Sequence, residues 1–531
     1  MSLRNEIKHH ARRVAKDVKA GKPSARADNA SEFMRERPEA VLGVLDLVRQ
    51  EADRTPPDNA AIQAHIYMFG AGLDEIRYPF EGEQDWAVAL VEAVLDRLLL
   101  LAEENTVPPH LLMRLVNAFV EAKLAPGDDL IELLGDVALD TAADQPVPTE
   151  AEIGEMFESI VEDAGGDEFE LHATLAESGN ALPPEFRMEM LNQFTTSGNP
   201  VLRDTATLYL LDDDREVRRT ASRLIGEHAA SALVSPVALR RMITIRNWLP
   251  NDERRNLDAA IKLSRQKQIE CAPWPPAMVE EIIVSNMDGG GAQSVFAIAK
   301  DGRKRRIACL LVKQGVGIAD AWRLRGQTKA EVREFLEHIH AETDSHAVER
   351  DFLEVLVPHY MEVGRKSGNP PAAGLLEFME TVGQENWRPR EVSPDNLLSL
   401  LEQGADPTYL QPAAVAETID ESGAWLDAFD FMESWFEEGA EVDAALSKYP
   451  GSGTPAQIDA IVESVLEPHR AIWAERFLWT ALWLKQDRDL LSPWREFFVV
   501  GRELHRRRPI ADIAVMRSIA EVTAMVGTMR E

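Results

Sequence analysis

Residues 201–229 read VLRDTATLYLLDDDREVRRTASRLIGEHA. Apolar side chains recur every three to four residues on both sides of a short acidic run, Asp212 to Asp214. This spacing predicts two amphipathic helices, because residues three and four apart share one face of an α-helix. The aspartates suit the turn between them, since an aspartate oxygen accepts free amide hydrogens at the start of a helix. The stretch therefore predicts a helix pair.

This helix pair resembles a HEAT-type repeat. The matching residues are Asp213 and Asp214 at the turn, Val217 and Arg218 at the start of the second helix, and Ala221, Leu224 and Ile225 on its inner face. Small Ala221 would let the two helices approach closely. No second equally clean copy is found in the chain. If the stacking extends, the resemblance implies a curved solenoid whose concave face binds a partner.

Most of the chain carries the same helical spacing. A capping box, Thr328 to Glu331, precedes one amphipathic segment, and Ser393-Pro394 opens another. The buried strand runs of a parallel α/β protein are missing between these segments, which favours an all-α fold. We therefore expect an irregular array of HEAT-like helical repeats with one small antiparallel β-meander inserted near residues 281–313.

The β-meander is predicted from a β-prone stretch interrupted by turn residues. We expect strands near 281–286, 292–300 and 303–312. Asp301-Gly302 lies between the last two and predicts a type I′ hairpin turn, which needs positive φ at both central positions.

Proline- and glycine-rich stretches and changes in composition divide the chain into six segments. They are a basic N-terminal helix or arm (1–26), an acidic helical lobe (27–200), a basic HEAT-like segment (201–272), the β-meander insertion (273–327), a second acidic lobe (328–449) and, after a linker-like stretch at 450–455, an aromatic-rich C-terminal unit (456–531). The aromatic side chains of this last unit surround one helix, so we expect them to form its core.

Charge is distributed very unevenly. The net charge is −33, yet residues 201–330 hold 22 Lys and Arg against 15 Asp and Glu, a net of +7. The flanking segments 27–200 and 331–531 carry −27 and −19. A basic belt between acidic lobes either meets an anionic partner or neutralises the lobes that it touches.

The candidate binding residues are cations of this belt. Around the hairpin turn they are Lys300, Arg303, Lys304, Arg305 and Arg306, and the secondary candidates on the helices are Arg218, Arg219, Arg240 and Arg241. Their role would be charge-assisted hydrogen bonding to carboxylates or phosphates. The competing interpretation is a solvated turn, or internal pairing with the chain's own carboxylates.

Signals for catalysis are absent from the sequence. Two cysteines, Cys271 and Cys309, exclude a disulfide framework and a cysteine zinc site. The histidines in 338–359 lack the i, i+4 pairing of a metal helix, and Gly289 to Gly291 lacks the lysine of a phosphate loop. We predict no catalytic residue, metal or cofactor. Neither a signal peptide nor a membrane-length apolar run is recognised, so we expect a soluble, cytoplasmic protein.

The expected function is that of a non-catalytic scaffold or adaptor that binds a macromolecule, with an acidic protein surface favoured as the partner. Two alternatives remain open. One is a nucleic-acid-binding accessory protein that uses the belt 201–330, and the other is an enzyme with an unrecognised site between the lobes.

Overall fold

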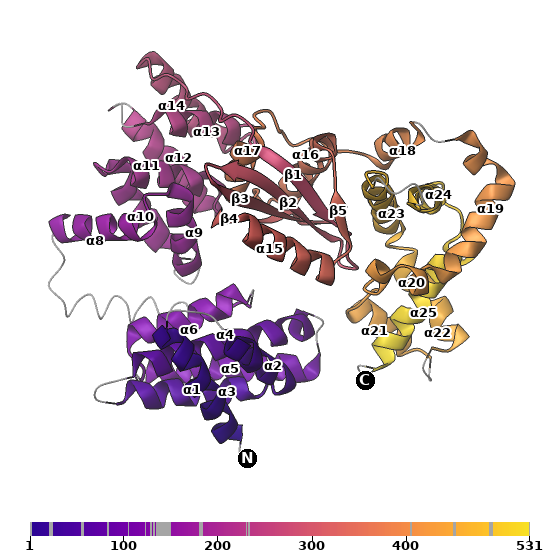
Figure 1. The fold of residues 1–531 in the computed structure, drawn as a ribbon, viewed down its shortest axis with the longest axis horizontal. Helices are drawn as coiled ribbons and strands as arrows, with labels where there is room; N and C mark the ends of the chain where they lie inside the picture. The colour runs from indigo at the N-terminus through magenta and orange to yellow at the C-terminus, as the bar shows by residue number, and fades with distance from the viewer. Residues whose placement is uncertain are drawn as a thin grey trace. The chain divides into compact units, whose positions relative to one another are not determined.

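The structure is a computed structural model. It describes residues 3–20, 25–54, 58–81, 84–104, 106–122, 124–127, 130, 133, 150–179, 184–229, 231, 234–403, 406–449, 453–487 and 492–529. The chain forms two compact units, Met1–Thr205 and Ala206–Glu531. The protein is mostly helical, with one small antiparallel sheet in the second unit (Figure 1).

The N-terminal unit is built from helices. They are α1 (Leu3–Ala20), α2 (Ala25–Glu36), α3 (Ala40–Ala52), α4 (Asn59–Glu81), α5 (Asp85–Glu103), α6 (Pro109–Glu121), α8 (Glu150–Asp163), α9 (Glu168–Gly179) and α10 (Pro184–Thr196), and α11 (Pro200–Leu208) begins in it. Ile7, Ala11 and Val14 of α1 are buried in the core that α1 to α6 share. The basic N-terminal segment therefore contains a helix that packs into the core of this unit.

The second unit opens with η1 (Tyr209–Leu211), α12 (Arg215–Ala229), α13 (Pro236–Ile245) and α14 (Arg254–Gln266). Asp214 Oδ1 accepts the backbone N–H groups of Glu216 and Val217 at 2.8 and 3.0 Å, so the acidic turn caps α12 as expected. Ala221 and its apolar neighbours on the inner face of α12 are buried. The prediction of two helices separated by an acidic turn in residues 201–229 is confirmed.

The sheet has five antiparallel strands. They are β1 (Val279–Ser285), β2 (Ala292–Asp301), β3 (Lys304–Lys313), β4 (Gly317–Gln327) and β5 (Ser345–Ala347), in the order β4-β3-β2-β1-β5. The three predicted strands are confirmed. β4 was not predicted because it mixes polar and apolar residues on a half-exposed edge, and β5 is too short to show a pattern.

The hairpin turn differs from the predicted type. Asp301 pairs with Lys304, so the two loop residues are Gly302 and Arg303. Gly302 has φ +61°, whereas Arg303 keeps a negative φ. Positive φ at the first central position alone is the pattern of a type II′ turn. The prediction of type I′ was wrong because Asp301 is the last strand residue rather than a turn residue.

Helices cover both faces of the sheet. On one face lies α15 (Lys329–Glu342), whose predicted capping box at Thr328 and Glu331 is present. Val332 of α15 joins a core with Phe296, Ile307 and other strand residues, and Figure 1 shows α15 lying along the strands. Side chains of the alternate strand positions are also buried, and α16 (Arg350–Ser367) and α17 (Gly374–Val382) pack against the strands there.

The remaining elements form a helical region around an aromatic core. They are α18 (Pro394–Glu402), η2 (Pro407–Leu410), α19 (Pro412–Glu421), η3 (Ser422–Ala424), α20 (Trp425–Ala428), η4 (Asp430–Met432), α21 (Ala440–Leu446), α22 (Pro455–Ile461), η5 (Val462–Leu466), α23 (Arg470–Leu484), α24 (Trp494–His505), η6 (Ile510–Asp512) and α25 (Ala514–Met529). Trp473, Phe477, Trp479 and Phe497 are buried, so the expectation of an aromatic core is confirmed. The centre of the expected linker, residues 450–452, lies outside the described residues.

Two indole N–H groups attach this helical region to β1 and to the loop that follows it. Trp483 Nε1 donates to the carbonyl of Val284 at 3.0 Å, and Trp435 Nε1 donates to that of Met287 at 3.1 Å.

None of the helices in the described part of the chain has the length and hydropathy that a membrane crossing needs.

Candidate binding site at the basic hairpin

Arg218 is held inside the protein. Its side chain is 6% exposed, and it donates Nε and Nη2 to the two carboxylate oxygens of Glu253 at 2.9 and 3.2 Å. Its Nη1 donates to the carbonyls of Asp212 and Asp213 at 2.7 and 2.9 Å. These bonds connect the turn before α12 to the residue that precedes α14. Arg218 therefore holds α12 and α14 together and is not a surface contact.

Arg240 and Arg241 are also buried, on α13. Both contact Glu380 of α17, at 2.5 Å from Arg240 Nη2 and at 3.1 Å from Arg241 Nε. Arg240 also donates to the carbonyl of Pro273 at 2.7 Å and lies over the ring of Trp274. These two arginines join α13 to α17, so they are removed from the candidate surface as well.

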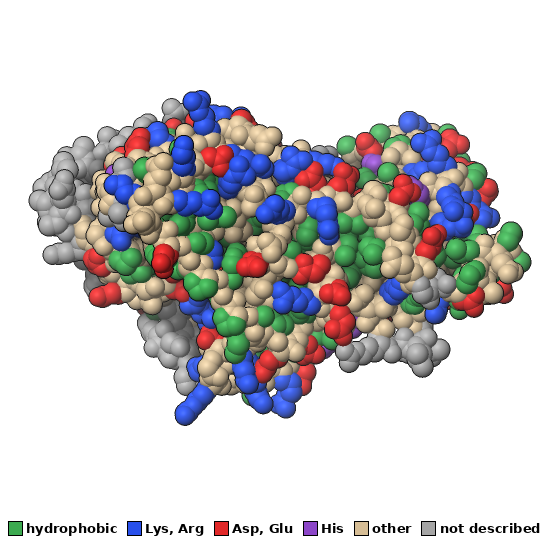
Figure 2. Space-filling view, turned by 90° about the horizontal axis from the view of Figure 1, so that it is seen from above, with side chains coloured by type: hydrophobic (Ala, Val, Ile, Leu, Met, Phe, Trp, Pro, Cys, Tyr) green, Lys and Arg blue, Asp and Glu red, His purple; other side chains and the backbone are tan. Residues whose placement is uncertain are grey.

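Other belt cations are paired at the surface. Arg219 donates to Glu216 on its own helix at 2.6 Å. At the hairpin, Arg305 donates to both oxygens of Glu280 at 2.8 and 3.3 Å, and Arg306 donates to Asp301 at 3.2 Å. Figure 2 shows the same mixing, with Asp and Glu interspersed among the Lys and Arg side chains of the visible face. Internal neutralisation thus accounts for much of the belt.

Three hairpin cations remain available to a partner. Lys300, Arg303 and Lys304 are exposed, and within the described ranges no carboxylate lies at ion-pair distance from them. Lys300 pairs in register with Arg305, so both lie on the α15 face of the sheet, while Lys304 lies on the opposite face. The turn thus presents positive charge on both of its sides.

The turn does not project as a free ribbon. β2 and β3 are inner strands. On the β1 side, Ala299 pairs with Val279, and the N–H of Lys300 donates to the carbonyl of Met278 at 2.9 Å. On the β4 side, Arg305 pairs with Gln327. Only the turn and its immediate neighbours extend beyond these flanking strands, so the site is a short basic rim.

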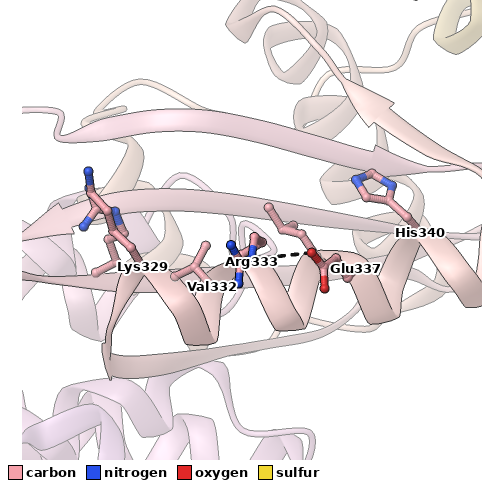
Figure 3. A pocket seen from close by; sticks show the side chains of 7 residues that line it. Lys329, Val332, Arg333, Glu337 and His340 are labelled. Atoms are coloured by element: carbon pink, nitrogen blue, oxygen red, sulfur yellow. Dashed lines mark ion pairs between the residues drawn. The ribbon is translucent and has the colours of Figure 1, made fainter.

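A groove adjoins this rim along α15. It encloses about 330 Å³ and is lined by Arg305, Lys329, Val332, Arg333, Leu336, Glu337 and His340. Figure 3 shows the labelled helix residues following one side of α15. Val332 and Leu336 supply apolar surface, Arg333 lies 3.5 Å from Glu337, and His340 Nδ1 lies 2.7 Å from Ser345 Oγ. Sequence reasoning missed this groove, although the cations Lys329 and Arg333 at helical spacing were a signal for it.

The glycine run before β2 is part of the packing. The N–H of Gly289 donates to Ser434 Oγ at 2.9 Å. A Cβ atom at Gly289 would lie 1.5 Å from the carbonyl oxygen of Ser434. This backbone approach explains the glycine without a bound phosphate.

The buried side chains His359 and Cys309, which could in principle take part in catalysis, are held by hydrogen bonds or covered by neighbouring residues. Among the described residues no cluster of three His, Cys, Asp or Glu side chains could hold a metal ion. His359 is buried, accepts the N–H of Val392 at Nδ1 and bonds Glu475 through Nε2 at 2.9 Å, so both ring nitrogens are occupied. Cys309 is buried under α15, and burial raises the pKa of its thiol to about 12. Such a thiol is a poor nucleophile at neutral pH.

Fold and site together describe a mostly helical protein with an inserted sheet and a basic hairpin rim. Residues 183–268 match the family model of the Y4lR second domain, and residues 395–527 match that of the Y4lR C-terminal helical domain. The chain is similar to the uncharacterized protein y4lR of Sinorhizobium fredii (strain NBRC 101917 / NGR234), with 26% identity over 469 residues, 87% of this chain and 88% of that protein. No solved structure matches the chain.

The two matched segments frame the site without including it. The first contains the helix pair at 201–229, and the second extends across the expected linker at 450–455. The sheet, the hairpin and α15 lie between them.

Proposed function

We propose that this chain is a non-catalytic scaffold or adaptor whose hairpin rim, Lys300, Arg303 and Lys304, binds an acidic surface of a protein partner. The observation that carries the proposal is the contrast within the basic belt. Arg218, Arg240 and Arg241 are buried against carboxylates of the same chain, whereas the rim cations are exposed. Exposed cations can form charge-assisted hydrogen bonds with carboxylates of a partner, and the flanking strands already fix the backbone that carries them.

A protein partner fits this rim better than a nucleic acid does. A ribbon that enters a nucleic-acid groove must project from its sheet, and here β1 and β4 flank the hairpin almost to its turn. Few cations are available to replace the counterions of a polyphosphate.

The helical frame would serve as the scaffold. We further propose that η1, α12, α13 and α14 form a HEAT-like stack. The supporting contact is Arg218, which bonds the turn before α12 and the residue before α14 at once. Such a stack would hold the sheet through Glu380 while leaving the rim exposed.

Partner capture tests the proposed function. The full-length chain is immobilised and exposed to extract from its native cells, alongside a rim variant carrying Lys300→Glu, Arg303→Glu and Lys304→Glu. A matched control reverses three other exposed belt cations, Arg255, Lys262 and Lys267. We expect one protein partner to be retained by the wild type and the control and lost by the rim variant. With that partner purified, the affinity of the rim variant should fall at least about tenfold.

Two outcomes would overturn the proposal. One is a partner that the rim variant retains with undiminished affinity. The other is rim-dependent binding of fluorescent duplex DNA or single-stranded RNA at low salt with a steep salt dependence, which would favour the nucleic-acid alternative.

A further inference from the structure

We infer that the groove beside α15 binds a short acidic segment of the partner that also carries two apolar side chains. This inference rests on the proposed function, because it assigns a recognition element to the same binding surface. It adds the chemical class of the peptide and the orientation in which the peptide lies.

The groove supplies an apolar floor that the sheet leaves uncovered. Val332 and Leu336 lie one helical turn apart and both line the groove. Val332 is buried against the sheet, while Leu336 stays partly exposed. A volume of about 330 Å³ lies at the lower end of the range of small-molecule pockets and has room for a pair of aliphatic side chains. Burying them against this floor would contribute hydrophobic free energy that the exposed rim lacks.

Positive charge is concentrated at the hairpin end of the groove. Lys329 is exposed, with no carboxylate of the described residues at ion-pair distance. Lys300 lies beside Arg305 on the same sheet face. Arg333 and Glu337 are 75% and 70% exposed, and their atoms approach only to 3.5 Å. An ion pair this exposed contributes little stability, so Arg333 can exchange Glu337 for a carboxylate of the partner.

The opposite end of the groove carries an acidic side chain instead of this cluster of cations. Glu337 and His340 lie there, and His340 is engaged with Ser345. A bound segment therefore directs its carboxylates toward Lys329 and the hairpin, and its apolar side chains toward Val332 and Leu336. Because Lys300 of the rim pairs in register with Arg305 of the groove, one continuous segment reaches both.

The experiment uses a random dodecapeptide library displayed on phage and selected against the full-length chain. We expect enriched sequences to combine Asp or Glu with two Leu, Ile or Phe residues three or four positions apart. A fluorescent peptide of the enriched sequence should lose affinity by about tenfold or more on Lys329→Glu and on Leu336→Ser. Lys448→Glu reverses an exposed lysine outside the groove and should leave the affinity unchanged.

The outcomes separate this inference from the proposed function. Enriched peptides that lack acidic residues, or that bind the Lys329→Glu protein as tightly as the wild type, would overturn the groove assignment. Lys329 is exposed, so its reversal tests the groove without disturbing the core. If the captured partner is lost by the rim variant but retained by both groove variants, the rim is the binding site and the groove is not.

Discussion

Arg240 Nη2 and Glu380 Oε1 lie 2.5 Å apart, although 140 residues separate them in the chain. Arg241 binds the same carboxylate from the next position of α13. One glutamate thus compensates two buried guanidinium groups, and it joins α13 to α17, a helix that covers the sheet. Such a pair fixes the relative placement of two elements more than it adds net stability, because the desolvation of the charges offsets much of their attraction.

Removing Glu380 should strongly destabilise the C-terminal unit. Glu380→Ala leaves two buried cations without their shared carboxylate, and loss of one partner from a buried pair costs about 3–5 kcal/mol. Urea unfolding followed by tryptophan fluorescence measures this loss. Glu385→Ala, at an exposed position nearby, should change the free energy of unfolding by less than about 0.5 kcal/mol. Equal stability of the two variants would show that Glu380 is dispensable.

Substitution of Gly302 should weaken the hairpin through the backbone alone. Its φ is +61°, and a Cβ atom at this position would meet nothing within 4 Å. Gly302→Ala should therefore cost about 1–2 kcal/mol of strain with no steric clash. Gly302→Asn should cost less, since asparagine tolerates positive φ better. Chemical denaturation of both variants compares the two costs, and an alanine variant as stable as the wild type would contradict the turn geometry.

The N-terminal unit should lose stability in mild acid because of His65. Burial, with smaller contributions from Lys8 and Arg54, lowers the pKa of this side chain from 6.5 to about 4. Between these values the unfolded state binds the proton and the folded state does not, so stability is full above pH 6.5 and falls as the pH approaches 4. The total effect is about 3 kcal/mol.

A histidine substitution isolates this effect. His65→Gln should remove about one proton from the slope of unfolding free energy against pH in that range, measured by denaturant titrations between pH 4 and 7. Gln63→Ala, at an exposed position of the same helix, removes no titrating group and should leave the slope intact. An unchanged slope in the His65 variant would mean that this histidine titrates alike in both states.

Features that depend on neighbouring residues could be predicted from the sequence. Asp214 caps α12 through N–H groups two and three positions on, and the capping box at Thr328 needs only Glu331. The strands β1 to β3 also followed from local composition. The turn type was missed because it depended on a one-residue shift of Asp301 into the strand.

Features that depend on distant residues could not be predicted. Nothing in the sequence around Arg218 or Arg240 indicates that Glu253 and Glu380 bury them, and both arginines were therefore assigned to a binding surface. The sequence showed where cations are concentrated along the chain, but it did not show which of them pair with distant carboxylates. The groove could not be predicted from the sequence for a related reason, because it forms only where α15 packs against β3.

The two cysteines should differ sharply in reactivity. Cys271 is exposed, whereas Cys309 is buried under α15 with its thiol pKa raised to about 12 by burial. Since the thiolate is the reactive form, a thiol reagent at pH 8 should modify Cys271 rapidly and Cys309 only after unfolding. Mass spectrometry of peptides labelled with iodoacetamide, with and without denaturant, distinguishes the two sites. Cys271→Ser serves as the control that leaves the native protein unlabelled. Rapid labelling of Cys309 in that variant would mean that α15 opens away from the sheet under native conditions, because no other described helix covers this thiol in the shared core.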